Sequence, residues 1–446
     1  MNKNDIVELN ITACTDTGNG IGKYAGMTVF VPSAAVGDKI RAKILKVKKN
    51  CAYAKTEEIL SPSKDRIIPD CPVFGKCGGC AFRHITYESE CAIKQTRVAD
   101  CIKRIAKIDV EPRPIVPADS YLRYRNKAQY PVSDSGQTGF YSLHSHRIVP
   151  CRDCLLQPKS FSLASDAFER FIKETGLSIY DENTGEGLIR HLCLRTNFQG
   201  DIMAVVVING TSLPFWNRLK ELLAETLGES FKSLQININT KRNNVILGEK
   251  CVTLYGDDRI TDSLCGVPIE LSPLSFYQVN RPMAQKLLKK AGEYVQPEGK
   301  TVLDLYCGAG AVGLSMAHKA KSVIGVEIVK DAVTNAIENA KKAGFDNTEF
   351  ICADASKAAD MLRLRGVKPD AVIVDPPRKG CDASLIKILT DGFAPERIVY
   401  ISCDPATLAR DASLICQNGY TLIEYTPFDL FPRTAHVETA ALFLKG

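Results

Sequence analysis

The C-terminal part of the chain alternates short apolar runs with helical segments, and this alternation restricts the fold more than any other feature. A helix is predicted over residues 281–295. After it come the runs TVLDLYC, SVIGVEI, TEFICAD, AVIVDPP, RIVYISC and ETAALFL. Strands that alternate with helices form a parallel, doubly wound sheet with helices on its faces. We therefore expect residues 273–446 to form a Rossmann-like α/β domain.

The residues before this domain divide into two further regions. Residues 1–62 alternate apolar and polar positions between glycine turns, a pattern typical of a small β-barrel. Residues 63–272 mix strand-like runs with a helical segment at 215–227, which predicts an α+β central domain. Basic residues gather between Lys39 and Lys55. They indicate either a solvated edge strand or a barrel that binds nucleic acid.

The composition excludes some classes of protein. With 45% hydrophobic and 24% charged residues, the 446-residue chain is typical of a globular protein, and we expect a monomer. No apolar run reaches the roughly 18–20 residues of a membrane span, so no membrane partner is expected. The first residues lack the apolar segment of a signal peptide, which favours a cytoplasmic location. In such a reducing compartment, grouped cysteines are more often metal ligands or catalytic thiols than disulfides, and this chain has 17.

A glycine-rich turn follows the first of the C-terminal runs. Gly308, Gly310 and Gly313 match the dinucleotide-binding pattern by letter, and glycines there let a ligand approach the start of a helix. Asp304, four residues before the first glycine, would repel a pyrophosphate. A carboxylate at this position suits a cationic ligand that carries an amino acid, such as S-adenosylmethionine.

Carboxylates also stand where later runs are predicted to end. Glu327 ends the second run and can take a ribose diol with two hydrogen bonds. Asp354 follows the third run, where it is placed to meet an adenine, and Asp375 follows the fourth. Asp304 alone could be a helix cap or a turn residue. Because ligands bind where parallel strands end, the series predicts one ligand site.

The reacting groups are predicted around Cys403. Asp375 precedes two prolines that fix the backbone, and Cys403 follows one strand later, so both should flank one crevice. D-P-P here is similar to a motif of methyltransferases that act on nucleic-acid bases. A thiolate adding to pyrimidine C6 lets C5 accept a methyl group, after which a base removes the C5 proton. His436 and Glu438 are candidate bases. Alternatively, Cys403 is a small buried hydrophobe and His436 only orients its neighbours.

Several motifs together resemble the RNA uracil-C5 methyltransferase family. They are SPLSFYQVN, LDLYCGAG, VIVDPPRKG, YISCDPATLARD and PRTAHVETAALF, with YLRYRNKAQYPV and GLIRHLCLR in the central region. The resemblance implies that Cys403 is the nucleophile and Glu438 the base. It implies further residues that contact S-adenosylmethionine or lie beside the uracil, namely Gln278, Tyr306, Glu327 and Asp375. Some relatives have an asparagine at the position of Ala311, so any contact from that side chain is missing here.

A group of cysteines indicates a metal centre. Cys71, Cys77 and Cys80 form a C-x5-C-x2-C array, and Cys151 or Cys154 could supply a fourth ligand. Four thiolates at this spacing suit either a zinc ion or an iron–sulfur cluster. The resemblance favours Cys154 and a [4Fe-4S] cluster. Methyl transfer needs no electron, so we expect the cluster to have a structural or RNA-positioning role.

The N-terminal barrel resembles the TRAM domain, an OB-like RNA-binding module. Its aromatic residues could stack bases or could belong to the barrel core; they are Tyr24, Phe30 and Tyr53. A second candidate RNA surface contains Arg123, Arg125 and Lys127. The barrel and the cysteines together favour 23S ribosomal RNA as the substrate. The alternatives are a transfer-RNA uracil-C5 methyltransferase, an RNA cytosine-C5 methyltransferase and a non-catalytic ribosome-assembly protein that binds RNA.

Overall fold

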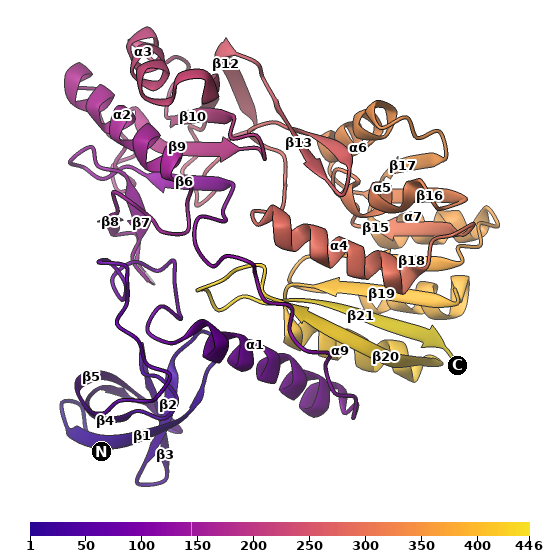
Figure 1. Ribbon diagram of the computed structural model, residues 1–446, viewed down its shortest axis with the longest axis horizontal. Coiled ribbons are helices and arrows are strands. Elements are labelled where there is room, and N and C mark those ends of the chain that lie inside the picture. Colours follow the sequence, from indigo (N-terminus) through magenta and orange to yellow (C-terminus); the bar gives the residue numbers. More distant parts are fainter. Residues whose placement is uncertain (144) are drawn as a thin grey trace.

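The computed structural model describes residues 1–143 and 145–446. Figure 1 shows the N-terminal barrel beside helix α1, a central sheet above it, and a larger α/β sheet that carries the C-terminus. The barrel closes in the strand order β1-β2-β3-β5-β4. Its strands are β1 (Ile6–Cys14), β2 (Gly20–Tyr24), β3 (Met27–Val31), β4 (Lys39–Val47) and β5 (Cys51–Ser61). Alternate residues of β1 and β4 point inward and fill the barrel, so the barrel predicted from the sequence is confirmed.

The central region contains a mixed sheet of order β12-β11-β10-β9-β6. Its strands are β6 (Lys127–Pro131), β9 (Ile189–Thr196), β10 (Ile202–Ile208), β11 (Phe231–Ile238) and β12 (Lys250–Gly256). Helices α2 (Lys159–Thr175) and α3 (Trp216–Leu227) cover one face through a shared apolar core. The other face packs against the C-terminal domain, since Val205 and Leu287 belong to one buried cluster. Two hairpins complete the region: β7 (Gly139–Tyr141) with β8 (Ile148–Pro150), and β13 (Ile260–Leu264) with β14 (Val267–Leu271).

The C-terminal domain is a seven-stranded sheet of order β17-β16-β15-β18-β19-β21-β20. The strands are β15 (Thr301–Leu305), β16 (Ser322–Glu327), β17 (Thr348–Cys352), β18 (Ala371–Val374), β19 (Arg397–Ser402), β20 (Tyr420–Phe428) and β21 (Glu438–Lys445). The helices are α4 (Arg281–Val295), α5 (Ala311–Ala317), α6 (Lys330–Lys342), α7 (Ala355–Leu364), α8 (Ala383–Lys387) and α9 (Pro405–Gln417). The first five strands are parallel, which confirms the predicted doubly wound sheet.

Two features of this domain differ from the sequence expectation. β20 was not among the predicted strands, and β21 pairs antiparallel with both β19 and β20. A short connection between consecutive strands allows only antiparallel pairing. In addition, α1 (Tyr87–Cys101) and the following turn Ile102–Ala106 pack against α9. Val98 and Leu408 lie in one core cluster, so this helix of the predicted central region covers the C-terminal sheet.

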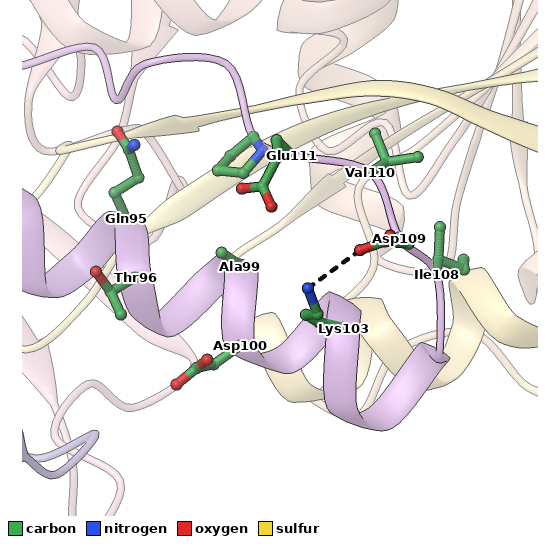
Figure 2. Close-up of a pocket in the computed structure, with 10 residues that line it drawn as sticks. Gln95, Thr96, Ala99, Asp100, Lys103, Ile108, Asp109, Val110 and Glu111 are labelled. Carbon is green, nitrogen blue, oxygen red and sulfur yellow. Dashed lines mark ion pairs between the residues drawn. The ribbon is translucent and has the colours of Figure 1, made fainter.

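The described helices include none that is both long and apolar enough to cross a membrane. A shallow pocket of about 300 Å³ lies between α1 and residues 108–112, as Figure 2 shows. Lys103 and Asp109 form an ion pair of 3.2 Å at its edge. None of the residues predicted for the functional site lines this pocket.

Candidate functional site

Cys403 and Glu438 lie opposite each other on neighbouring strands of the C-terminal sheet, at the side where its parallel strands end. β19 and β21 pair antiparallel with Ser402 opposite Thr439, so the next position outward places Cys403 opposite Glu438. β18 pairs with β19 on the other side, and Asp375 directly follows its last residue. The thiol and the two carboxyl groups therefore converge where the parallel strands end, the edge at which such sheets bind ligands.

A tight turn presents the Cys403 thiol. Ser402 Oγ accepts a hydrogen bond from the Asp404 N–H at 3.1 Å, and Asp404 Oδ1 accepts one from the Thr407 N–H at 2.8 Å. Asp404 is thus the N-cap of α9, and Pro405 begins the helix with its fixed backbone angle. Cys403 is left between the strand and the helix, half-buried rather than packed inside a core.

The charges around Cys403 oppose its ionisation. Burial raises the pKa of the thiol to about 11, and the nearby Glu438 and Asp375 carboxylates raise it further. Burial also raises the pKa of Glu438 well above its ordinary value, with a contribution from Asp375. Arg378 lowers the pKa of both groups. Arg378 was not named as a site residue from the sequence, although it directly follows the D-P-P motif.

His436 lies two residues before Glu438. Its ring stands edge-on to Phe431 at 5.9 Å between centroids, and its backbone N–H donates to Thr434 Oγ1 at 3.3 Å. Burial, followed by the charge of Arg378, lowers the pKa of His436 to about 4. The imidazole is therefore neutral at neutral pH.

Asp304 lies inside β15, whereas the sequence placed it at the end of that strand. It is completely buried, and Oδ2 accepts a hydrogen bond from the Gly313 N–H at 2.9 Å. Oδ1 has no partner within the described part of the chain. Burial raises the pKa of Asp304 to about 7, and the carboxylates of Asp375 and Glu327 add to the effect. A cationic ligand group near this edge would offset the accumulated negative charge.

Glu327 fixes the glycine-rich turn. Its two carboxylate oxygens accept hydrogen bonds from Gly308 N–H at 3.1 Å and from Val329 N–H at 2.9 Å. Gly308 has a φ of +56°, and a Cβ there would meet nothing within 4 Å, so the space beside the turn is open. Asp354 caps α7 through Oδ1, which accepts from Ser356 N–H at 3.1 Å, and its placement beside an adenine stays a prediction. The helix-cap reading weighed for Asp304 thus describes Asp354.

The segment that contains Gln278 joins the central and C-terminal domains. The Gln278 carbonyl accepts from Asn126 Nδ2 at 2.9 Å, and Arg195 Nη2 donates to the Ser275 carbonyl at 2.6 Å. Asn280 caps α4 and donates through Nδ2 to the Leu430 carbonyl at 3.0 Å. Tyr306 follows β15 with a left-handed φ of +64°, and burial raises the pKa of its hydroxyl.

The predicted metal-binding cysteines line one cavity. Cys71, Cys77, Cys80, Cys151 and Cys154 surround about 90 Å³, together with three polar side chains, Arg83, Arg125 and Gln157. Each of these polar side chains has a buried nitrogen or oxygen without a hydrogen-bond partner in the described residues. A hydrogen bond from Cys151 lowers the pKa of Cys154 to about 6. Among the described residues, no three His, Cys, Asp or Glu side chains are grouped closely enough to hold one metal ion.

These observations bear on the kind of group that would fit the cavity. A single zinc ion needs four ligand atoms about 2.0–2.3 Å from one centre, and the thiols do not converge in that way. In a cluster each thiolate binds a different iron, so the sulfur atoms stand farther apart. The unpartnered guanidinium nitrogens of Arg83 and Arg125 would meet acceptors on an anionic group. The donor set therefore fits a cluster better than a zinc ion.

The barrel presents basic and aromatic side chains outward. Along β4, Ile40, Ala42 and Ile44 are buried in the barrel, while most of the basic residues are exposed. Tyr24 and Tyr53 are 39% and 38% exposed, and Lys48 Nζ lies 5.2 Å from the centre of the Tyr53 ring. Phe30 packs beside Tyr53 at 5.6 Å between ring centroids. The two tyrosines thus lie on the surface rather than in the barrel core.

The second predicted RNA surface is not an exposed basic patch. Arg123 pairs with Asp153 at 2.5 Å and also donates to the carbonyl of Cys154. Arg125 lines the cysteine cavity. Lys127 is mostly buried, and burial lowers the pKa of its ammonium group to about 8. The alternation of tyrosine and basic residues in the sequence could not distinguish these contacts from a surface.

Comparisons with known proteins show the family to which this chain belongs. Residues 86–446 match the profile of the tRNA (uracil-5-)-methyltransferase family, and residues 2–56 match the TRAM domain. An uncharacterized RNA methyltransferase of Clostridium tetani is 39% identical over 99% of this chain and 96% of its own length. One from Staphylococcus epidermidis is 40% identical over 99% and 98%.

A solved structure matches the whole architecture. It is a Pyrococcus abyssi tRNA (uracil-54, C5)-methyltransferase in complex with S-adenosyl-L-homocysteine. It is 27% identical, with a TM-score of 0.79, and the match covers 98% of this chain and 100% of that one. By its family profile, its full-length relatives and its fold, this chain belongs to the family of RNA uracil-5-methyltransferases and carries an N-terminal TRAM domain.

Proposed function

We propose that this protein transfers a methyl group from S-adenosylmethionine to C5 of a uridine in RNA. The observation that carries the proposal is the pairing of β19 with β21, which sets Cys403 opposite Glu438 at the ligand-binding edge of the sheet. A thiol opposite a buried carboxyl group supplies both the nucleophile and the base that this reaction needs.

S-adenosylmethionine is the methyl donor that the residues around the glycine turn would hold. The related Pyrococcus abyssi enzyme contains S-adenosyl-L-homocysteine, the demethylated form of that donor. Asp304 supplies a buried negative charge, and Glu327 has lone pairs for a ribose diol. Gln278, Tyr306 and Asp375 are the other residues proposed to contact the donor or the uracil.

In the first chemical step the Cys403 sulfur bonds to C6 of the uracil. The thiol loses its proton, and the electron pair of the C5–C6 double bond moves toward C5 and the adjacent carbonyl. C5 then bonds to the methyl group of the donor as the bond from that group to the sulfonium sulfur breaks, which leaves S-adenosyl-L-homocysteine. Because the pKa of the thiol is raised to about 11, this step needs help with deprotonation, and Arg378 favours the thiolate.

In the second step Glu438 removes the C5 proton. The electron pair left at C5 re-forms the double bond and expels the Cys403 thiolate, which gives 5-methyluridine. A carboxylate whose pKa is raised by burial is a stronger base than an exposed one, and its proton affinity is better matched to neutral pH. His436, whose pKa is lowered, is a neutral neighbour and not the first choice for the base.

RNA that contains 5-fluorouridine tests both roles. Fluorine at C5 cannot leave as a proton, so wild-type enzyme should form a covalent complex with this RNA that survives denaturing electrophoresis. Cys403→Ala should form none. Glu438→Gln should accumulate the complex even on ordinary uridine RNA. A non-catalytic RNA-binding protein would form no complex in any case, and a cytosine-specific enzyme would be trapped only by 5-fluorocytidine RNA.

We propose 23S ribosomal RNA as the substrate, because the barrel and the cysteine group accompany the catalytic domain. The second candidate is transfer RNA, which the match to the Pyrococcus abyssi enzyme favours. That match extends over nearly the whole chain, so the barrel does not by itself select ribosomal RNA. Mapping 5-methyluridine in ribosomal and transfer RNA from cells with and without the gene decides between them.

We also propose that Cys71, Cys77, Cys80 and Cys154 bind a [4Fe-4S] cluster. The shared cavity supports it, as do the guanidinium nitrogens of Arg83 and Arg125 that have no hydrogen-bond partner in the described residues. Anaerobically purified protein should contain about four iron atoms per chain. Its absorption spectrum should show the visible bands of an iron–sulfur cluster. One equivalent of zinc without iron would favour the alternative. Cys77→Ser should lose the metal and lower stability or RNA affinity.

A further inference from the structure

The loop that leads into Glu438 is held by a group of buried charges. This loop, residues 429–437, connects β20 to β21 and is called the base loop below. Figure 1 shows it reaching from the sheet toward the segment before α1. The exposed fractions of Asp429, Glu90 and Lys94 are all 1% or less. Lys94 Nζ donates to Glu90 and to Asp429, each at 2.7 Å, and so anchors the start of the loop on α1.

Arg433 occupies the middle of the base loop and is buried. Its side chain is 5% exposed, and its φ of +68° lies in the left-handed region that non-glycine residues rarely adopt. Its backbone N–H donates to Glu90 Oε1 at 2.7 Å. Its carbonyl accepts from the N–H groups of Ala81 at 2.8 Å and Phe82 at 3.1 Å. These three bonds hold the strained backbone in place.

The Arg433 side chain binds the same neighbouring segment. Its Nη1 donates to the carbonyls of Ile85 at 3.0 Å and Phe82 at 3.4 Å, and its guanidinium lies 4.2 Å from the centre of the Tyr121 ring. The contacted residues begin directly after Cys80. The base loop therefore docks on the continuation of the cysteine segment rather than on its own domain alone.

We propose that Arg433 is a positioning residue that sets the place of Glu438 by docking the base loop on residues 81–85. The inference rests on the proposed function, since it assigns Glu438 the removal of the C5 proton. Four residues lie between Arg433 and Glu438, and within the described part of the chain the hydrogen bonds of Arg433 do not involve Cys403. Loss of the docking should therefore impair proton removal while leaving thiol addition and methyl transfer intact.

The test follows the covalent intermediate on ordinary uridine RNA. Lysine keeps the charge of Arg433, but its side chain is shorter and lacks the planar guanidinium that lies against the Tyr121 ring. Arg433→Lys should lower kcat by about 10–100-fold, as expected for a catalytic group displaced by about 1 Å, with KM for S-adenosylmethionine changed less than about threefold. The methylated protein–RNA complex should accumulate on denaturing gels, because its C5 proton is removed slowly. A merely destabilised enzyme would lose activity without accumulating the complex.

Arg190→Lys is the matched control. Arg190 is equally buried, donates through Nη1 to the carbonyls of Asn239 at 2.7 Å and Lys241 at 3.0 Å, and lies 4.3 Å from the Tyr180 ring centre. It contacts the central sheet and not the base loop, so its lysine variant should accumulate no complex.

A second variant covers the case in which Arg433→Lys does not fold. Arg97 is only partly buried and donates to the carbonyl of Ala435 in the base loop at 2.7 Å. Arg97→Gln should also accumulate the complex. Turnover of both variants at the wild-type rate, or slow turnover without the complex, overturns the inference. If wild-type enzyme forms no complex with 5-fluorouridine RNA, the proposed function itself fails first.

Discussion

At the scale of single residues, the sequence predicted which groups lie close together but not their electrostatics. Cys403 was singled out because it follows a strand directly, and the resemblance added Glu438; their catalytic roles stay predictions. Arg378 was missed as a site residue because its effect is a charge acting through space on Cys403 and Glu438. Asp354 was predicted to lie beside a ligand, and the structure shows that its carboxylate caps α7, a use that the sequence pattern did not reveal.

The raised pKa of Cys403 predicts a steep pH dependence. With a pKa of about 11, the thiolate fraction grows about tenfold per pH unit between pH 7 and 9. The rate of adduct formation on saturating 5-fluorouridine RNA should rise in parallel in rapid-quench measurements. Arg378→Gln removes the charge that lowers this pKa, so its rates should be lower at each pH and its profile displaced to higher pH.

An exposed arginine elsewhere controls for the lost charge. Arg365 directly follows α7, is exposed, and is not among the charges that shift the pKa of Cys403. Arg365→Gln should therefore keep the pH–rate profile of the wild type. Superimposable profiles of Arg378→Gln and wild type would show that Arg378 does not govern the thiol.

At the scale of helices and strands, the sequence predicted the strands that have continuous apolar runs. It did not predict which charged residues are buried in ion pairs. Five of the expected C-terminal strands form the parallel part of the sheet. β20 was overlooked because its sequence, YTLIEYTPF, alternates polar residues and contains a proline. Charged residues on a helix such as α1 usually face solvent. Its Glu90 and Lys94 are instead buried against Asp429, a partner more than 300 positions away that no local pattern reveals.

Alanine in place of two helical glycines, Gly313 and Gly292, should change the free energy of unfolding in opposite directions. A Cβ on Gly313, in α5, would meet Val323 Cγ1 at 2.8 Å and Asp304 Oδ2 at 2.9 Å. Gly313→Ala should therefore lower the free energy of unfolding by about 1–3 kcal/mol through overpacking. A Cβ on Gly292, in α4, meets only Met316 at 3.8 Å. Gly292→Ala should raise the free energy of unfolding by about 0.5–1 kcal/mol, because alanine restricts the unfolded chain more than glycine does.

Thermal unfolding and S-adenosylmethionine binding measure both effects. Gly313→Ala should bind the donor more weakly, because its extra methyl group displaces the buried Asp304 carboxylate. Gly292→Ala should bind it as wild type does. A Gly313→Ala enzyme as stable as wild type and with unchanged donor affinity would contradict the close helix–strand packing described here.

At the scale of the whole molecule, the basic surface of the barrel and the proposed catalytic site lie in different domains. The net charge of +6 is modest, so it is the position of the basic residues that matters. Exposed lysines follow β4 into its turn, beside the partly exposed Tyr53, while the proposed catalytic site lies in the C-terminal sheet. The sequence predicted the three regions but not how they pack, because their contacts join residues far apart in the chain.

Two double variants of equal charge test whether the barrel binds RNA. Lys48 and Lys49 are exposed on the barrel, whereas Lys321 and Lys368 are exposed at the start of β16 and before β18, at the sheet edge opposite the site. Each phosphate contact to a single strand contributes a slope of about −0.7 in log K against log salt concentration. Lys48→Gln with Lys49→Gln should therefore weaken RNA binding and reduce the steepness of that plot by about 0.7–1.4. Lys321→Gln with Lys368→Gln should leave the slope unchanged. Equal losses in both variants would mean that net charge, and not the barrel surface, attracts the RNA.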